Sequence, residues 1–415
     1  MHAIDWRSPR YGWWLWAAFL LVLTISVAMD PFWRVGVTPT YREAAAKWWA
    51  QQDLYTPGIH GFQYLPLSAI LFTPVTRLPF LVGEESWRWL GVVLLAWGVW
   101  RLCRLATPKG TASVFVLVTV LTIPTAVDAA RIGQANLLFS ALLLHATADV
   151  ARRRWWAAAV ALSLLVALKP FGLVMVLLVA ALYGPIRSYL VWGLAAVLAS
   201  PFLFGPTTYV LGQYHWALVK LMVSSRPGPG RWADLTSLLW AAGGHPSEAM
   251  MTGVRLAAAV GALALSRRAV HRWGEPRASI LTLAVATTYL MLCNPRTQEN
   301  SYVMLGPVAA LFTAWALLVD RRRWAAALLL AVCVGLGFHR AFSVQPNNYW
   351  LQPLVALLFA GYLVYITLAN RLPADSALFG GPRALARPHA PEPAGGAASA
   401  TASEVPVDFL RAPVG

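Results

Sequence analysis

Amide, carboxylate and basic side chains gather in a few short segments between long apolar runs. Two such segments, DAARIGQAN at residues 128–136 and NPRTQENSY at residues 294–302, mix all three types. A guanidinium such as that of Arg131 offers a fork of donors that matches a phosphate, and Lys169, at the end of an apolar run, can face one as a point charge. The same residues would also serve as helix caps and snorkelling anchors. The candidates in these segments and beside the later apolar runs are Arg131, Gln134, Asn136, Lys169, Arg296, Glu299, Asn300 and His339.

The loop that follows the first apolar run, residues 30–63, is the other source of candidate chemistry. It begins with Asp30 and includes Glu43, and it leads through DLYTP to Tyr64. Thr38 and Thr40 are suited to cap a short helix lying along the membrane surface. This helix would also serve as an interfacial anchor without any chemistry. One of its faces would comprise Tyr41, Ala44, Ala45 and Trp48.

The elements that position these residues are membrane helices, because the composition excludes an ordinary soluble protein. Of the 415 residues, 58% are hydrophobic and 12% are charged, against roughly 25% charged in globular domains, and the mean hydropathy is +0.58. The net charge of 33 − 17 = +16 suits cytoplasmic loops beside anionic lipid, so no nucleic-acid partner is expected. Cys103, Cys293 and Cys333 lack metal-like spacing and read as core residues.

Apolar runs of spanning length predict an all-α polytopic protein with about twelve transmembrane helices. The proline-rich segment 64–82 (YLPLSAILFTPVTRLPFLV) decides the topology. If it dips in from outside and returns, every arginine cluster lies in the cytoplasm, as does the amino terminus. Prolines also suit a broken or re-entrant segment better than a plain helix. The predicted spans are residues 11–29, 86–104, 112–127, 134–150, 155–168, 170–184, 188–204, 249–266, 278–293, 302–319, 324–338 and 349–369.

This topology divides the chain into a membrane domain, residues 1–371, and a tail, residues 372–415, that is too rich in Ala, Pro, Gly and Ser to bury a core. The membrane domain has two long outer loops, residues 30–63 and 205–248. We expect a multi-pass protein of the plasma membrane with a disordered cytoplasmic tail. Phosphate-binding loops, Rossmann glycines, HExxH and serine elbows are all missing from the sequence, so ATP-driven transport and the common hydrolase classes lack support.

The order of the motifs resembles glycosyltransferase family 87. Tyr41 and its small neighbours, DLYTP, YLPL, GQAN, a Lys-Pro pair at residue 169 and NPRTQENSY follow one another on one predicted side of the membrane. The resemblance covers roughly residues 12–370 and implies a GT-C-like bundle with an active site at the outer face. It further implies transfer of a hexose, mannose in several members, from a polyprenyl-phosphate sugar to a lipid or glycan acceptor. A lipid-linked saccharide flippase and an inactive scaffold of the same fold are the alternatives.

The resemblance implies an inverting reaction without metal or cofactor, in which a carboxylate of the first outer loop acts as general base. The family usually carries an Asp a few residues before the position of Tyr41, where Val37, Thr38 and Pro39 stand in this chain. We therefore favour Asp30 as the base, with Glu43 and Glu299 as alternatives. The implied substrate-binding residues are Tyr41, Tyr64, Arg131, Gln134, Asn136, Lys169, Arg296, Asn300 and His339.

Overall fold

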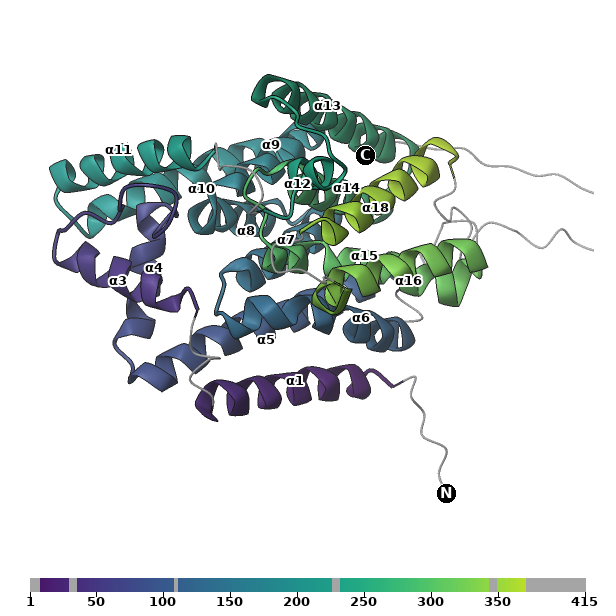
Figure 1. Cartoon of the computed structure of the whole chain (residues 1–415), viewed down its shortest axis with the longest axis horizontal. Helices are drawn as coiled ribbons and strands as arrows, with labels where there is room; N and C mark the ends of the chain where they lie inside the picture. The colour runs from purple at the N-terminus through teal and green to yellow at the C-terminus, as the bar shows by residue number, and fades with distance from the viewer. Residues whose placement is uncertain (1–7, 30–35, 108–110, 226–231, 343–348, 371–415) are drawn as a thin grey trace, which may run out of the picture. The chain divides into compact units, whose positions relative to one another are not determined.

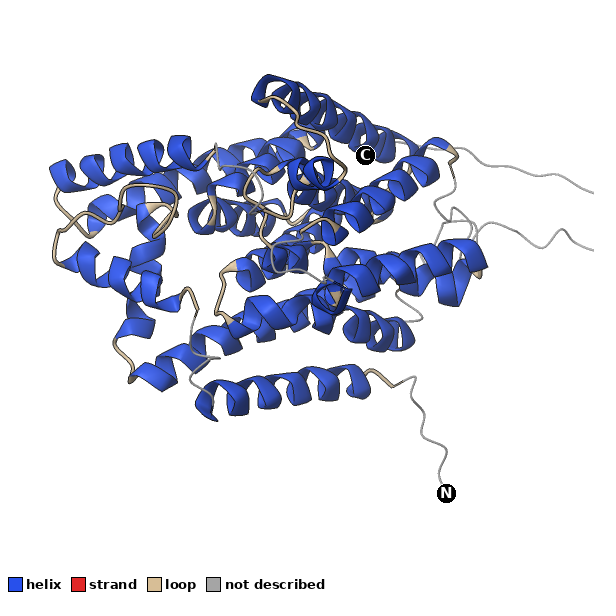
Figure 2. Ribbon diagram, in the orientation of Figure 1, coloured by secondary structure: helices blue, strands red, loops and turns tan. Residues whose placement is uncertain are grey.

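The computed structural model describes residues 8–29, 36–107, 111–225, 232–342 and 349–370. The predicted tail lies outside these residues, as does Asp30. Helices and connecting loops make up the described residues, which contain no strand (Figure 2), so the all-α fold class is confirmed. The helices are α1 (Arg10–Met29), α3 (Thr38–Trp49), α4 (Pro66–Thr76), α5 (Phe80–Ala106), α6 (Thr111–Arg131), α7 (Asn136–Ala151), α8 (Trp155–Leu168), α9 (Leu173–Leu182), α10 (Arg187–Ala199), α11 (Thr207–Ser224), α12 (Leu235–Ala241), α13 (Glu248–Arg272), α14 (Arg277–Cys293), α15 (Gly306–Trp315), α16 (Arg323–Gly337), α17 (His339–Phe342) and α18 (Leu351–Leu368).

Among the described residues, six stretches of helix are long and apolar enough to cross a membrane, and several shorter apolar helices accompany them. The long stretches are Arg10–Met29, Phe80–Ala106, Ala112–Arg131, Gly184–Leu203, Glu248–Arg272 and Leu351–Leu368. Many large apolar side chains on their outer faces are exposed, as expected where lipid rather than water is the solvent. The chain is therefore a polytopic membrane protein, and the number of about twelve crossings stays a prediction.

The first helices alternate in direction, which gives the bundle two distinct ends (Figure 1). Near the start of α5, Trp89 donates a hydrogen bond of 2.8 Å to Thr24, close to the end of α1. At the other end of α5, Arg101 pairs with Asp149 at 2.5 Å, close to the end of α7. The end of α1 and the starts of α5 and α7 therefore share one end of the bundle. The basic cluster around Arg101 lies at the opposite end.

The segment 64–82 is broken, as predicted from its prolines. Helix α4 runs from Pro66 to Thr76, and α5 begins at Phe80 after a break at residues 77–79. With a rise of about 1.5 Å per residue, α4 is about 16 Å long, which is about half the thickness of a hydrocarbon core. It is too short to cross. The path of this segment through the membrane stays a prediction.

Helix α3 confirms the helix predicted in the first loop and corrects its cap. Its buried face comprises Tyr41, Ala44, Ala45 and Trp48, as the spacing predicts, together with Thr38. Val37 is the N-cap residue and makes no side-chain capping bond. The Thr38 hydroxyl instead donates to Glu84 of α5 at 2.5 Å. Thr38 is the first residue within α3 and not its N-cap, so its hydroxyl does not cap the helix and donates to the buried carboxylate.

In the long loop predicted at residues 205–248, the described residues include the helices α11 and α12. The side chains of α11 that face the protein recur at helical spacing, but three of the five are polar. Gln213 accepts a hydrogen bond of 3.0 Å from Leu54 N and donates one of 3.1 Å to Asp53. Because its inner face is polar, α11 lacks the apolar stripe by which an amphipathic helix is recognised. The buried residues of α11 are Val210, Gln213, Ala217, Lys220 and Ser224.

Candidate active site

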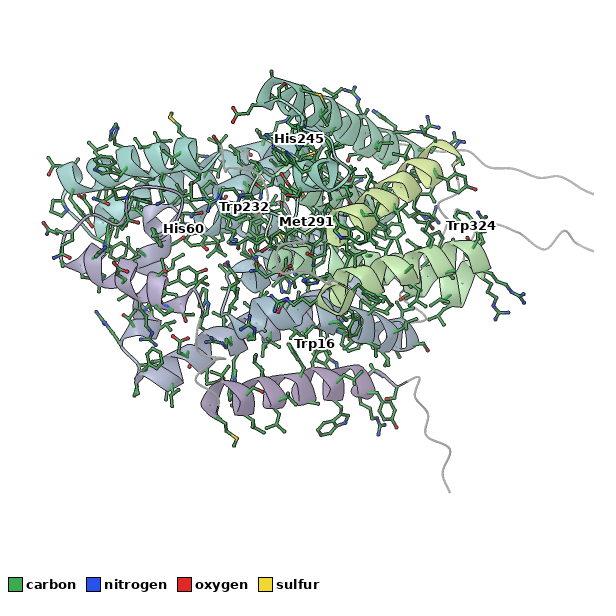
Figure 3. All side chains as sticks on the ribbon, viewed as in Figure 1. Trp16, His60, Trp232, His245, Met291 and Trp324 are labelled. Atoms are coloured by element: carbon green, nitrogen blue, oxygen red, sulfur yellow. The ribbon has the colours of Figure 1, made fainter. Side chains whose placement is uncertain are left out.

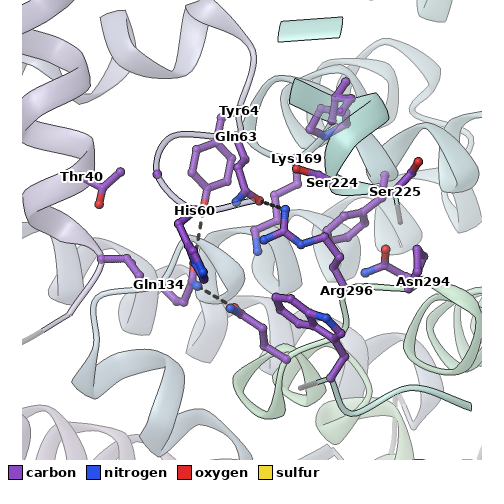
Figure 4. Close-up of a pocket in the computed structure, with 18 of the residues that line it drawn as sticks. Thr40, His60, Gln63, Tyr64, Gln134, Lys169, Ser224, Ser225, Asn294 and Arg296 are labelled. Carbon is purple, nitrogen blue, oxygen red and sulfur yellow. Dashed lines mark hydrogen bonds between the residues drawn. The ribbon is translucent and has the colours of Figure 1, made fainter. Parts of the chain in front are cut away.

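A cavity of about 420 Å³ lies at the end of the bundle where α5 and α7 begin. Figure 4 shows residues that line it. Its walls come from α3, the loop before α4, the α6–α7 turn, the α8–α9 junction, the end of α11 and the loop after α14. Except for the end of α11, these are the segments in which the sequence places the candidate chemistry. The polar and charged lining residues are Thr40, Tyr41, His60, Gln63, Tyr64, Gln134, Lys169, Ser224, Ser225, Asn294, Arg296 and Gln298.

Lys169 brings a buried positive charge to the cavity. It lies in the junction between α8 and the 3₁₀ turn Pro170–Gly172 and is 9% exposed. Its ammonium group lies 5.9 Å from the ring centre of Tyr64 and 5.5 Å from that of Phe171. Among the described residues it forms no ion pair with a carboxylate. Burial and the nearby Arg296 lower the pKa of Lys169 to about 7, because both disfavour its charged form.

Arg296 supplies the second cation and is held rigidly. Its two terminal nitrogens donate to Gln63 Oε1 at 2.7 Å and to the carbonyl oxygen of Ile59 at 2.8 Å. The guanidinium also lies 4.9 Å from the ring of Trp232. Its Nε atom is buried without a hydrogen-bond partner among the described residues, and so is Nε1 of Trp232. Unpartnered buried donors beside a cavity favour an anionic or hydroxyl-bearing ligand there.

Neutral side chains joined by a chain of hydrogen bonds form another wall of the cavity. The Tyr41 and Tyr64 hydroxyls lie 2.9 Å apart, and Tyr41 donates to Gln134 Oε1 at 3.0 Å. Gln134 Nε2 in turn donates to Gln298 Oε1 at 3.0 Å. Burial raises the pKa of Tyr64 to about 12, so its phenol stays protonated. This chain links three predicted binding residues to Gln298, which the sequence analysis did not select.

No carboxylate lines the cavity among the described residues. Glu43 lies on the exposed side of α3, where it pairs with Lys47 at 2.6 Å. Glu299 lies outside the lining set, 3.4 Å from His339 and 3.2 Å from Arg340. Burial raises the pKa of Glu299, but His339 and Arg340 outweigh it and hold that pKa below its usual value. A carboxylate with a lowered pKa is a weaker base.

The remaining candidates lie near the cavity but do not line it. The backbone carbonyl of Arg131, at the end of α6, accepts hydrogen bonds of 3.3 and 3.0 Å from Arg88. Asn136 donates to Asn300 at 2.6 Å and ties the start of α7 to the 3₁₀ turn Glu299–Met304. His339 belongs to the cluster around Glu299. These residues support the walls of the cavity from behind.

Sequence reasoning missed several lining residues, above all His60 and Trp232, which Figure 3 labels. Both lie in segments that look like ordinary connectors, and no motif marks them. Lys220 of α11 shapes this wall, because its ammonium group donates to the carbonyl oxygens of Thr56 and Gly58 at 2.7 and 2.8 Å, and to that of His60. The bend it holds places His60 and Gln63 at the cavity. Lysines on helices are common, so nothing in the sequence marks Lys220 as a residue that shapes the cavity.

The cavity is suited to hold an anion beside hydroxyl-bearing groups. Lys169 and Arg296 line it, two of its lining residues carry buried donors without a hydrogen-bond partner, and its described lining has no carboxylate. In a comparison with protein families, the model of glycosyltransferase family 87 matches residues 62–295, which include most of the cavity lining. No curated protein matches the chain.

Proposed function

The chain belongs to glycosyltransferase family 87 and is a membrane glycosyltransferase, and on that premise we propose that it transfers a hexose from a polyprenyl-phosphate sugar to a lipid or glycan acceptor at the outer face of the plasma membrane. The proposed sugar is mannose. The proposal rests on one observation. Two basic side chains, Lys169 and Arg296, line the same cavity, and its described lining has no carboxylate. A phosphodiester would supply the missing negative charge.

In the proposed reaction the acceptor hydroxyl attacks the anomeric carbon from the face opposite the phosphate. A base takes the hydroxyl proton as the new glycosidic bond forms. The bond between the anomeric carbon and the phosphate oxygen breaks, and the polyprenyl phosphate leaves with the electron pair. Lys169 and Arg296 would stabilise the charge that gathers on the departing phosphate, which is the largest electrostatic change in the reaction.

Asp30 remains the proposed base. It follows Met29 directly, and α1 ends at the end of the bundle that holds the cavity. Glu43 pairs with Lys47 on an exposed surface, and Glu299 pairs with Arg340 outside the cavity lining, so neither is placed to receive a proton in the cavity. His60 is the competing base, because it lines the cavity and imidazole is a common proton acceptor.

The cavity favours transfer over the alternative of a flippase. A flippase needs its phosphate-binding groups to be reachable from both leaflets, whereas Lys169 and Arg296 lie together at one end of the bundle. A scaffold that binds the donor without reaction stays a second candidate. The absence of a carboxylate among the described lining residues favours it.

The experiment uses the full chain in lipid nanodiscs with labelled polyprenyl-phosphate mannose and extracts of membrane lipids and glycans as acceptors. We expect transfer by the parent. Lys169→Met and Arg296→Met should each lower turnover by roughly two orders of magnitude, as expected on losing one preorganised donor. Lys47→Met is the matched control, because Lys47 is a lysine on an exposed ion pair away from the cavity.

The same assay separates the candidate bases and the scaffold. Asp30→Asn should abolish transfer without changing donor binding, while Glu43→Gln and His60→Gln should transfer. Loss of transfer in His60→Gln with full activity in Asp30→Asn would instead make His60 the base. Tight donor binding by a parent that transfers no sugar to any acceptor would establish the scaffold.

A further inference from the structure

A second polar cluster lies outside the cavity lining and has no part in the proposed transfer. It joins Asp128 of α6, Glu299 of the 3₁₀ turn and His339 of α17, with Arg340 on its solvent side. One ligand atom from each of the first three residues can be chosen so that all lie within 4.8 Å of one another. His339 Nε2 lies 3.4 Å from Glu299 Oε2 and 3.9 Å from Asp128 Oδ2. Three elements thus converge through groups that ligate metals.

The buried ring of His339 points its free nitrogen into this cluster. The residue is 6% exposed, and its Nε2 has no hydrogen-bond partner among the described residues. Its Nδ1 lies 3.3 Å from the carbonyl oxygen of Leu336. The side-chain amide of Gln352 donates to that oxygen and to the carbonyl oxygen of Glu299 at 3.2 Å each. The same amide nitrogen lies 3.0 Å from Nδ1, so Nδ1 has both a donor and a carbonyl acceptor beside it, whereas Nε2 has neither and faces two carboxylates.

Two carboxylates and an unpartnered ring nitrogen that converge in this way are suited to share a positive charge. A proton on Nε2 would fill that place poorly, because the nearest carboxylate oxygen, at 3.4 Å, does not complete a hydrogen bond with it. A metal ion fits better. Bonds of about 2.0–2.2 Å to His and carboxylate ligands separate neighbouring ligand atoms by roughly 3–4 Å, and the two distances from Nε2, 3.4 and 3.9 Å, lie in this range.

Arg340 does not block the site. Its guanidinium lies 3.2 Å from Asp128 Oδ1 and 3.2 Å from Glu299 Oε2, and its side chain is 57% exposed. A long exposed side chain can swing into solvent at little cost, since a surface ion pair contributes little to stability. An incoming divalent cation would displace the guanidinium and neutralise the negative charges of both carboxylates.

We propose that Asp128, Glu299 and His339 bind one divalent transition-metal ion of the Zn²⁺ type, which cross-links α6, the 3₁₀ turn and α17. A nitrogen with two carboxylate oxygens is a ligand set that such ions accept, with a solvent molecule completing the coordination. The ion is structural and takes no part in the transfer. It fixes the turn that directly follows Arg296 and Gln298. The proposal stands independently of the proposed function.

The test measures metal binding itself. The full chain, with any affinity tag removed, is purified in nanodiscs, stripped with a chelator and titrated calorimetrically with Zn²⁺ alone, and with Co²⁺ to observe its ligand-field absorption. We expect one ion per chain. Asp128→Asn and His339→Gln should each weaken binding by at least about tenfold, since even loss of an outer partner of a ligand has an effect of that size. Glu43→Gln and His215→Gln are matched controls, because both residues are exposed and lie outside the cluster.

Arg340→Gln distinguishes a metal site from an ion-pair brace. If the cluster binds metal, removing the competing guanidinium should tighten Zn²⁺ binding several-fold and leave the chain folded. If His339 is instead a protonated member of a salt-bridge network, this variant should lower the melting temperature and Zn²⁺ should not restore it. Binding of no ion by the parent, or equal binding by the parent, Asp128→Asn and His339→Gln, would overturn the proposal.

Discussion

The buried ammonium group of Lys169 makes donor binding depend on pH near neutrality. With a pKa of about 7, the protonated fraction of the ligand-free protein falls from about 0.9 at pH 6 to about 0.03 at pH 8.5. A phosphodiester stays anionic throughout this range and binds the protonated form. The sign is therefore fixed: affinity is highest at low pH and falls as the pH rises through 7. The ratio of the two fractions predicts an affinity about 30-fold lower at pH 8.5 than at pH 6.

This prediction can be measured by titrating a short-chain polyprenyl-phosphate sugar into the purified protein at several pH values. Lys169→Arg keeps its charge at every pH, so its affinity should be nearly constant, and Lys169→Met should bind weakly and also without pH dependence. His60 lines the same cavity, so the titration is repeated with His60→Gln to remove its ring from the result. A parent whose affinity does not change between pH 6 and pH 8.5 would refute the reasoning, as would an equal slope in Lys169→Met.

Two further predictions concern the support of the cavity. Glu84 is fully buried and lies 2.7 Å from Arg88 and 3.2 Å from Arg42, so Glu84→Gln should lower the free energy of unfolding by about 3–5 kcal/mol, the usual loss on breaking a buried pair. Denaturant titration in detergent micelles checks this, with exposed Glu43→Gln as control. Gly133 has a φ of +65°, and a Cβ there would lie 2.6 Å from Thr38 Cγ2, so Gly133→Ala should reduce stability by about 1–3 kcal/mol and lower transfer by displacing Gln134. Unchanged melting and transfer would contradict this.

The sequence was sufficient to predict which residues share one end of the bundle. Once the broken segment 64–82 is taken not to cross, alternation of the spans places the α6–α7 turn, the α8–α9 junction and the loop after α14 on the same side. The structure brings Gln134, Lys169 and Arg296 from these segments into one cavity with Tyr41 and Tyr64. The helix predicted at Tyr41 also followed from spacing alone, because its buried face has a helical period.

The sequence was insufficient to predict how the helices are arranged around the bundle, and this arrangement decides which residues line the cavity. Alternation says that Arg131 and Arg296 lie at the same end, but only the order of helices around the bundle decides which of them lines the cavity. It is Arg296, whereas the carbonyl of Arg131 caps the buried Arg88. Helix α11 was missed for a related reason. Its inner face is polar because Gln213 and Lys220 form hydrogen bonds with backbone groups of the loop before α4. A hydropathy pattern does not reveal hydrogen bonds of this kind.

The charges near the cavity explain why its described lining lacks a carboxylate and lead to a last prediction. Asp53 accepts a hydrogen bond from Gln213, and Glu299 pairs with Arg340, so these two acidic groups have other partners and do not neutralise Lys169 or Arg296. Placing a carboxylate against Arg296 should therefore weaken donor binding. Gln63 is suited to this change, because its Oε1 already accepts a bond of 2.7 Å from Arg296.

Gln63→Glu keeps the size and the hydrogen bond of the parent side chain but adds a negative charge. The new ion pair would satisfy Arg296 internally and also raise the pKa of Lys169 by favouring its charged form. We expect the affinity for a phosphodiester donor at pH 6 to fall about tenfold or more, and the pH dependence between pH 6 and pH 8.5 to flatten. The exposed Gln52→Glu adds the same charge away from the cavity lining and should bind as the parent does. Equal affinities for the parent and Gln63→Glu would mean that the anion does not bind at Arg296.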